Sequence, residues 1–303
     1  MARRLYLARS SGHPITRLSK HMKIYDCFTF YNELDLLELR LRETYDHVDV
    51  FVIAEATSTF QGREKPLYLK ENWDRFAPWH DKIRLIEITD LAESGDPWAN
   101  EAASREHLKA GLHDAEDLDL IVLSDVDEIL RPATLDLMRS GNRAVYGTRM
   151  PLFYFRLNYM QTHPTQWWAG ASAVRFKLLN DMEQLRKMRH TIGITENSVI
   201  MHAGWHFGWL GDDVRAREKI ASFAHSELNK AEVLDNINLE LSIQNGHGLN
   251  PHASDSEDKH VIVEVDDYFP DTVLVDKERW MQYIIPNATE KVTDLLRFGT
   301  VPR

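Results

Sequence analysis

Short apolar segments recur along the first part of the chain, and they constrain its fold more than any other feature. Residues 24–30, 48–54, 83–88 and 120–123 are nearly continuous runs of apolar side chains. Such runs are typical of strands buried on both faces of a parallel sheet, whereas a strand with one solvent-exposed face alternates apolar and polar residues. Leucines at helical spacing follow the first run, and 98–112 also suits a helix. The sequence therefore predicts an α/β fold with a mostly parallel central sheet flanked by helices.

The pattern changes after Pro132. We expect longer, aromatic-rich strands over 144–159, 171–179 and 199–209, a helix over 212–229, a strand over 261–265 and a short helix near 278–284. Residues 245–260 are polar and rich in Gly, Pro and Ser, which predicts a surface loop.

Composition limits the kinds of partner. The 303 residues are 43% hydrophobic and 27% charged, which suits one large domain or two small ones. The net charge is −11, and since residues 1–21 carry five basic and no acidic side chains, the remainder carries −16. An acidic body argues against a nucleic-acid partner, which requires a basic surface. It is compatible with a nucleotide diphosphate, because a bound divalent cation inverts the local charge.

The ends of the chain and its single cysteine bear on location. Cys27 has no partner for an intrachain disulfide, which fits a reducing, cytoplasmic compartment. No run approaches the roughly 18–20 apolar residues of a membrane span, and the N-terminus lacks the apolar stretch of a secretory signal. Because Met22 directly precedes the first predicted strand, residues 1–21 are interpreted as a flexible basic extension. The alternative is a basic arm that contacts an anionic partner.

Two acidic positions follow predicted strands. Asp125 and Asp127 come directly after the run 120–123, and Glu55 directly follows the run 48–54. Ligands of parallel α/β folds bind beyond the carboxyl ends of the strands. Two carboxylates there can hold one hard divalent cation, which would bridge the phosphates of a nucleotide-sugar. The alternative is a solvated acidic turn, since Asp-x-Asp is common in acidic proteins.

A pair of histidines forms the second cluster. His202 and His206 are four residues apart and would share one face of a strand. One of them could join Asp125 and Asp127 on a metal or donate to a phosphate, and Gly204 would let the backbone approach the ligand closely. The alternative is a core histidine bonded to the backbone.

Five segments occur in an order that is similar to a known family: 26–40 (DCFTFYNELDLLELR), 52–56 (VIAEA), 61–67 (QGREKPL), 125–128 (DVDE) and 203–206 (AGWH). Over roughly 22–290 the chain resembles the β-1,4-mannosyl-glycoprotein 4-β-N-acetylglucosaminyltransferases. The resemblance implies a GT-A-type, Rossmann-like fold, a UDP-sugar donor carrying N-acetylglucosamine, Mn²⁺ or Mg²⁺, and inversion at the anomeric carbon. The animal enzymes have a membrane anchor and several cysteines, so the chain looks more like a microbial or viral branch with a glycan or other hydroxyl acceptor.

The resemblance also assigns residues. Asp125 and Asp127 look like the metal and diphosphate pair, and His206 looks like the family histidine that binds the metal or the pyrophosphate. Arg105, which follows an Asp-x-Trp motif, would balance the charge of the diphosphate. Glu55 is expected to contact the nucleoside or the sugar. If His206 fails as third ligand, His202 and His225 are next.

An inverting transfer also needs a general base within about 2.6–3.2 Å of the acceptor proton. The candidates after the metal motif are Asp181, Glu183, Asp212, Asp213 and Glu227. Glu183 is preferred, because 183–189 resembles an acid-then-basic run of the family. A surface helix with salt bridges explains that run equally well. Asp127 and Glu183 are thus the expected catalytic residues.

The predicted organisation is the extension 1–21, a single domain over 22–290 and a C-terminal tail over 291–303. Within the domain, 22–130 would bind the nucleotide-sugar and 131–290 the acceptor. Two other functions stay open. A glycoside hydrolase also uses two carboxylates, about 5–10 Å apart, and a non-catalytic carbohydrate-binding protein would use Trp167 and Trp168.

Overall fold

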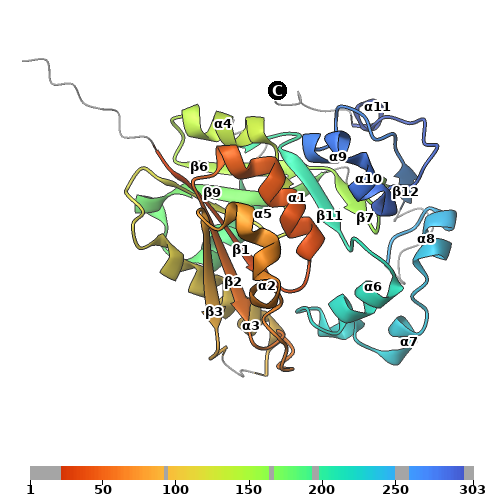
Figure 1. The fold of residues 1–303 in the computed structure, drawn as a ribbon, viewed down its shortest axis with the longest axis horizontal. Helices are drawn as coiled ribbons and strands as arrows, with labels where there is room; N and C mark the ends of the chain where they lie inside the picture. The colour runs from red at the N-terminus through yellow and green to blue at the C-terminus, as the bar shows by residue number, and fades with distance from the viewer. Residues whose placement is uncertain (1–21, 92–94, 164–166, 193–197, 250–258, 297–303) are drawn as a thin grey trace, which may run out of the picture.

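Two sheets carry the fold of this protein, seen in a computed structural model that describes residues 22–91, 95–163, 167–192, 198–249 and 259–296 (Figure 1). The larger sheet has the strand order β10-β6-β9-β4-β1-β2-β3, and the smaller one β12-β8-β7-β11-β5. The strands are β1 (Ile24–Phe30), β2 (Val50–Ala56), β3 (Ile83–Ile88), β4 (Leu120–Leu123), β5 (Glu128–Leu130), β6 (Val145–Met150), β7 (Leu152–Tyr154), β8 (Tyr159–His163), β9 (Trp168–Arg175), β10 (Val199–Ile200), β11 (Gly204–Gly208) and β12 (Lys259–Ile262).

The larger sheet is mostly parallel. β1 pairs in parallel with β2 on one side and with β4 on the other, and β3 continues in parallel beyond β2. Only β9 runs antiparallel to its neighbours β4 and β6. The chain thus fills one side of β1 first and then crosses to the other side, which creates a topological switch point between β1 and β4.

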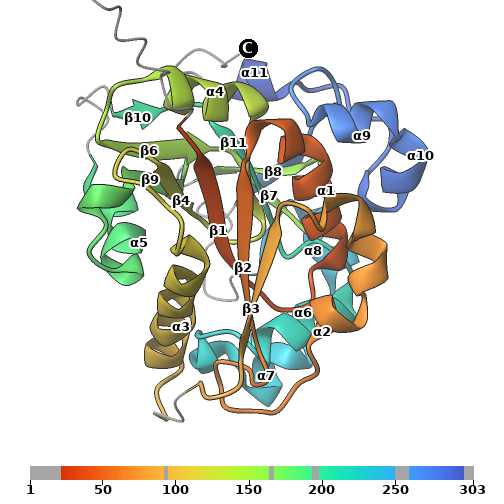
Figure 2. The same cartoon turned by 60° about the vertical axis from the view of Figure 1, so that its left-hand side comes forward.

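Helices cover both faces of this sheet (Figure 2). The helices of the described residues are α1 (Leu34–Thr44), α2 (Tyr68–Glu71), α3 (Pro97–Glu106), α4 (Pro132–Ser140), α5 (Met182–Thr191), α6 (Asp213–Ile220), α7 (Ala231–Leu234), α8 (Leu239–Asn245), α9 (Asp271–Val275), α10 (Lys277–Trp280) and α11 (Val292–Leu295). The predicted α/β fold, with a mostly parallel central sheet flanked by helices, is confirmed.

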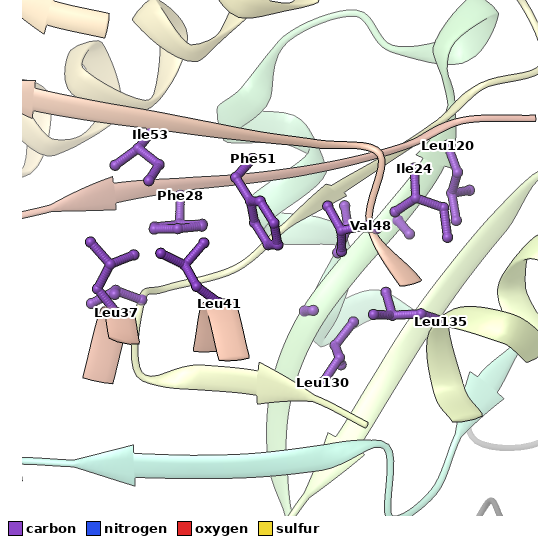
Figure 3. Close-up of a cluster of buried hydrophobic side chains, with 14 of the residues drawn as sticks. Ile24, Phe28, Leu37, Leu41, Val48, Phe51, Ile53, Leu120, Leu130 and Leu135 are labelled. Atoms are coloured by element: carbon purple, nitrogen blue, oxygen red, sulfur yellow. The ribbon is translucent and has the colours of Figure 1, made fainter. Parts of the chain in front are cut away.

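Alternate residues of β1 face two different cores, as strand geometry requires. Phe28 packs with Leu37 and Leu41 of α1 on one face of the sheet (Figure 3). Tyr25 and Cys27 face the other core, which α5 and the turn after α3 cover. Because both faces are buried, the strand needs no polar side, and this explains the continuous apolar run in the sequence.

Of the long strands expected in the second half, 144–159 and 199–209 are broken, and for these two the expectation was wrong, whereas 171–179 corresponds largely to the unbroken strand β9. The segment 144–159 forms β6 and β7 on either side of Pro151, whose missing N–H cannot continue a ladder. The segment 199–209 forms β10 and β11, separated at His202 with a φ of 52°. In both cases the second piece belongs to the smaller sheet, where β7 pairs with β11. The sequence did not predict this second sheet.

The helix expected over 212–229 is shorter than predicted. α6 ends at Ile220, and a 3-10 turn over Ser226–Leu228 follows. Gln61, in the loop after β2, donates from Nε2 to the carbonyl oxygens of Ile220 and Phe223, at 3.0 Å each. These bonds satisfy carbonyl groups that the end of a helix leaves open. They also tie the α6 segment to the loop after β2.

Asp35 links α1 to the C-terminal part of the chain. It accepts hydrogen bonds from Arg75, Arg279 and Tyr283. Burial alone would raise the pKa of Asp35, but these donors outweigh it and lower the pKa to about 2.

Because the folded pKa lies below the unfolded one, the ionised Asp35 stabilises the fold above about pH 4, and this stabilisation is lost as the pH falls towards 2. Asp35→Asn should therefore lower the free energy of unfolding by about 2 kcal/mol at pH 7. Urea unfolding at several pH values should show the gap to the unchanged protein narrowing below about pH 4. A gap that does not change with pH would contradict this account.

Several predictions fall outside the described chain. Residues 1–21, most of the expected loop over 245–260 and the last residues of the tail are not among the described residues. Of the helices that are described, none is long and apolar enough to cross a membrane.

Candidate active site

A cavity of about 570 Å³ opens beyond the carboxyl ends of β1, β2 and β4. Residues of α3, α5, β11 and α6 complete its wall. In Figure 2, α6 lies beyond the lower ends of β2 and β3. The cavity therefore occupies the switch point between β1 and β4, the place where ligands bind in folds of this kind.

Asp127 lines this cavity and has two nitrogen neighbours. Its side chain is buried, with Oδ2 2.9 Å from Nζ of Lys219 and Oδ1 3.5 Å from Nε2 of His206. Burial alone would raise the pKa of Asp127, but Lys219 and His206 outweigh it and hold the pKa well below its usual range. In turn, Asp127 raises the pKa of Lys219, although burial alone would lower it. Asp127 is therefore ionised at neutral pH.

The two predicted histidines have different surroundings. His206, on β11, lines the cavity, and its ring lies 4.6 Å from that of Trp168. Its Nδ1 is buried and makes no hydrogen bond within the described structure. His202 lies in the core of the smaller sheet instead, with Nδ1 3.0 Å from the hydroxyl of Tyr268 and its ring against Trp167. The structure thus separates a cavity histidine from a core histidine.

Glycine is needed at position 204 for a structural reason that differs from the expected one. A Cβ atom at this position would lie 2.0 Å from the carbonyl oxygen of Ile129 on β5. The glycine therefore lets two strands of the smaller sheet approach each other, and the backbone it clears space for belongs to the protein rather than to a ligand.

Asp125 faces a different cation from Asp127. Its carboxylate is one-third exposed and pairs with Arg186 of α5. Glu128, at the end of the same turn, is fully buried and accepts from Arg189, at 2.9 Å, and from Trp168, at 2.7 Å. Burial and the nearby Asp125 raise the pKa of Glu128. Arg186 also lies 3.5 Å from Glu128, so Asp125 and Glu128 both face α5, whereas Asp127 faces Lys219 and His206.

The predicted metal ligands consequently lie together only in part. Asp127 and His206 are neighbours, whereas Asp125 points towards α5. Within the described ranges, no group of three or more His, Cys, Asp and Glu side chains lies close enough to hold a metal ion.

A buried ion pair lies next to the turn 125–128 and stabilises it. Arg40 of α1 is 1% exposed and binds Asp26 of β1 through Nε, at 2.8 Å. Its NH1 group donates to the carbonyl oxygens of Asp125 and Glu128, at 2.8 and 3.2 Å, and its NH2 group donates to Ser124. One guanidinium thus fixes both ends of residues 125–128, the acidic turn.

Glu55 is fully buried and does not line the cavity. Both of its carboxylate oxygens lie 3.1 Å from the backbone nitrogen of Leu69, and Nζ of Lys65 is 3.6 Å away. Burial raises the pKa of Glu55, and Lys65 offsets this only in part. Direct contact with a nucleoside or sugar, expected from the sequence, does not follow from this position. Glu55 holds the loop that brings Lys65 to the cavity.

Arg105 and Glu183 both line the cavity, and they are bonded to each other. NH1 of Arg105 lies 2.9 Å from Glu183, and NH2 lies 2.8 Å from Glu101. Burial raises the pKa of Glu101, and Arg105 offsets this only in part. Glu101, which the sequence reasoning missed, is thus a second cavity carboxylate with a perturbed pKa, a feature that marks functional sites.

The other candidate bases have structural roles or lie outside the description. Asp181 and Asp212 cap the N-termini of α5 and α6, and Asp213 accepts from the backbone of Leu239. The side chain of Glu227 is not among the described ones.

Two lysines of the cavity had no role in the sequence analysis. Lys219 lies on α6, and no motif or spacing marks it. Lys65 falls within the matched segment 61–67, with Nζ 5.3 Å from the ring centres of Tyr31 and Tyr68. Burial lowers the pKa of Lys65, and Glu55 offsets this only in part. The resemblance of 61–67 was therefore the available signal for Lys65.

Solved structures of three transferases are among the proteins this chain is similar to. One is an inositol-1-phosphate CTP transferase from T. maritima, with 10% identity and a TM-score of 0.33 over 62% of this chain and 86% of the other. Another is a mannosyltransferase from Pyrobaculum calidifontis in complex with GDP-Man and Mn²⁺, with 12% identity and a TM-score of 0.33 over 69% of this chain and 65% of the other. A third is the glycosyltransferase GlyE of Streptococcus pneumoniae TIGR4, with 11% identity and a TM-score of 0.30 over 73% and 53%. These scores are too low to carry an argument about the site.

Comparison at the level of sequence families is decisive. No curated protein matches the chain. A family model described as glycosyltransferase family 17 matches residues 8–252, which include the acidic turn, Arg105 and His206. This match covers most of the chain, and the protein belongs to glycosyltransferase family 17.

Proposed function

We propose that this glycosyltransferase moves a sugar from a UDP-sugar to a hydroxyl acceptor, with a divalent cation held by Asp127 and His206. The observation that carries the proposal is the arrangement of Asp127, His206 and Lys219 at the switch point of the sheet. The carboxylate and the imidazole can hold a divalent cation, and the ammonium group can bind phosphate oxygens. The arrangement therefore suits a substrate with two phosphates. N-acetylglucosamine as the sugar rests on the family resemblance alone.

The residues present fit a cation with two protein ligands. Oδ1 of Asp127 and Nε2 of His206 are 3.5 Å apart, a separation that two ligands of one ion can have when each bond is about 2.1 Å. Sites that bind metal with phosphate use one or two protein ligands and leave the other positions to phosphate and water. When bound, the ion would neutralise the charge that forms on the leaving diphosphate.

Cationic side chains surround the same point. Lys219 lies against Asp127, and Arg186 lies against Asp125, so each acidic residue holds a cation at the cavity wall. Charge-assisted bonds from such groups to phosphate oxygens are strong and directional. We propose that Lys219 and Arg186 bind the diphosphate, and that Asp125 positions Arg186.

For the general base we propose Glu183, in line with inversion at the anomeric carbon. Glu183 lines the cavity from α5, and Arg105 fixes its carboxylate. Glu101 shares Arg105 and has a raised pKa, so it is the alternative. Comparing Glu183→Gln with Glu101→Gln separates them: loss of kcat with donor affinity unchanged identifies the base.

The experiment that tests the proposed function is a thermal-shift titration. A ligand that binds only the folded state adds RT ln(1 + [L]/Kd), about 2.7 kcal/mol at a hundredfold excess over Kd. UDP or UDP-N-acetylglucosamine with Mn²⁺ should raise the Tm well above the effect of either component alone. Free glycans without nucleotide serve as the control. If glycans stabilise the protein and UDP with Mn²⁺ does not, the sugar-binding or hydrolase alternative replaces the proposal.

A further inference from the structure

Trp98 is a large apolar side chain that the fold leaves open to solvent. It lies in the first turn of α3, where Asp96 caps the helix by accepting from the Trp98 backbone nitrogen. Its side chain is 48% exposed and lines the cavity. Tryptophan is usually mostly buried, so an exposed one in a cavity wall indicates a surface for a ligand.

Trp98 is the outer end of a row of ring contacts that begins beside Asp127. Nζ of Lys219 lies 5.4 Å from the ring centre of Trp209, whose ring is 5.4 Å from that of Phe223. Phe223 is followed by His225 at 5.2 Å, and His225 by Trp98 at 4.6 Å. Trp98, Phe223 and His225 all line the cavity. The row therefore leads from the proposed diphosphate site to the rim of the cavity.

The row lies on the β2 side of the site. Asn100, on α3, donates to the carbonyl oxygen of Phe60 in the loop after β2, at 2.9 Å. Gln61 of the same loop binds the carbonyl oxygen of Phe223. Trp168 lies on β9, which the strand order places on the other side of β4 and β1 from β2. Glu183 lies on α5, which packs on β9 and is joined to α3 by the pair of Glu183 with Arg105. A nucleotide-sugar carries its base and its sugar at the two ends of its diphosphate, so the two groups occupy different parts of the cavity.

We infer that Trp98, together with His225, forms the subsite for the base of the nucleotide. This inference rests on the proposed function and adds the position of the donor within the cavity. A base is a flat aromatic group, which stacks on aromatic side chains without needing a specific hydrogen-bond pattern. The first half of the sheet is also the part that binds the nucleotide in doubly wound folds. The sugar and its acceptor then lie towards Trp168 and α5.

Calorimetric titration with two probes tests this assignment: UDP with Mn²⁺, and inorganic pyrophosphate with Mn²⁺, which lacks the base. Trp98→Ala should weaken UDP binding by about tenfold to a hundredfold, the usual effect of losing one base-stacking ring. It should leave pyrophosphate binding unchanged. Trp98→Phe should restore most of the affinity for UDP, because a smaller ring still stacks. Trp98 is exposed, so these variants should fold normally.

The possible outcomes distinguish a failure of this inference from a failure of the proposed function on which it rests. If UDP binds the unchanged protein and Trp98→Ala binds it equally well, the inference is wrong. If Trp98→Ala instead raises the KM of the acceptor with UDP affinity unchanged, the row belongs to the acceptor side. If UDP with Mn²⁺ does not bind the unchanged protein at all, the proposed function itself fails.

Discussion

Replacing Arg40 with methionine should lower the free energy of unfolding by about 3–5 kcal/mol, the usual cost of breaking a buried ion pair. Arg40 and Asp26 are both buried, so the change leaves Asp26 charged without a partner. The carbonyl groups of Asp125 and Glu128 would also lose their donor. Because these groups shape the acidic turn, transfer per folded molecule should fall as well. Urea unfolding and turnover measured on the same sample would check both effects.

The double variant Asp26→Asn with Arg40→Met separates stability from positioning. It removes the uncompensated charge, so much of the stability should return, whereas the turn still lacks its donor and activity should stay low. Arg42→Met is a matched control on the same helix. Arg42 is partly exposed and pairs with Asp276 and Glu38, so its loss should cost no more than about 1 kcal/mol. Equal stability of the Arg40 and Arg42 variants would rule out the supporting role.

The parts of the fold that the sequence predicted are those whose cause is local. β1, β3 and β4 have the predicted bounds, because burial on both faces leaves continuous apolar runs. The smaller sheet could not be predicted in this way. Its strands β7 and β11 follow Pro151 and His202, where the chain leaves one sheet for another without changing its apolar character. The hydrophobic pattern of a sequence indicates which strands are buried, but it does not indicate which sheet a strand joins.

The residues of the candidate site also differ in whether the sequence alone could identify them. Asp127 and His206 were identified because strand ends and a family motif mark them. Lys219 was not, because its position beside Asp127 depends on how α6 packs beyond the sheet. Glu55 shows the opposite case: it has the right position in the sequence, but Leu69 and Lys65 occupy its carboxylate. A strand end places a residue near a site, and only packing decides where its side chain points.

Asp127→Asn should abolish most Mn²⁺-dependent transfer. A metal that stabilises charge in the transition state is worth several kcal/mol, which corresponds to a loss of about a thousandfold in rate. The fold should survive, because asparagine keeps the shape and Lys219, which is 27% exposed, can be hydrated. His206→Ala should lower Mn²⁺ affinity in the same way. Initial rates over a range of Mn²⁺ concentrations, with the Tm of each variant, would measure these effects.

Asp125→Asn and His202→Ala are the matched controls. Asp125 pairs with Arg186 and lies away from His206, so its variant should keep its Mn²⁺ affinity and lose rate through a displaced Arg186. His202 is bonded to Tyr268 in the core, so its variant should cost about 1–3 kcal/mol of stability with near-normal turnover per folded molecule. If Asp125→Asn and Asp127→Asn lose Mn²⁺ affinity equally, both carboxylates bind the ion and the turn must rearrange when the donor enters. If neither variant changes the response to Mn²⁺, Lys219 and Arg186 carry the charge of the diphosphate without a metal.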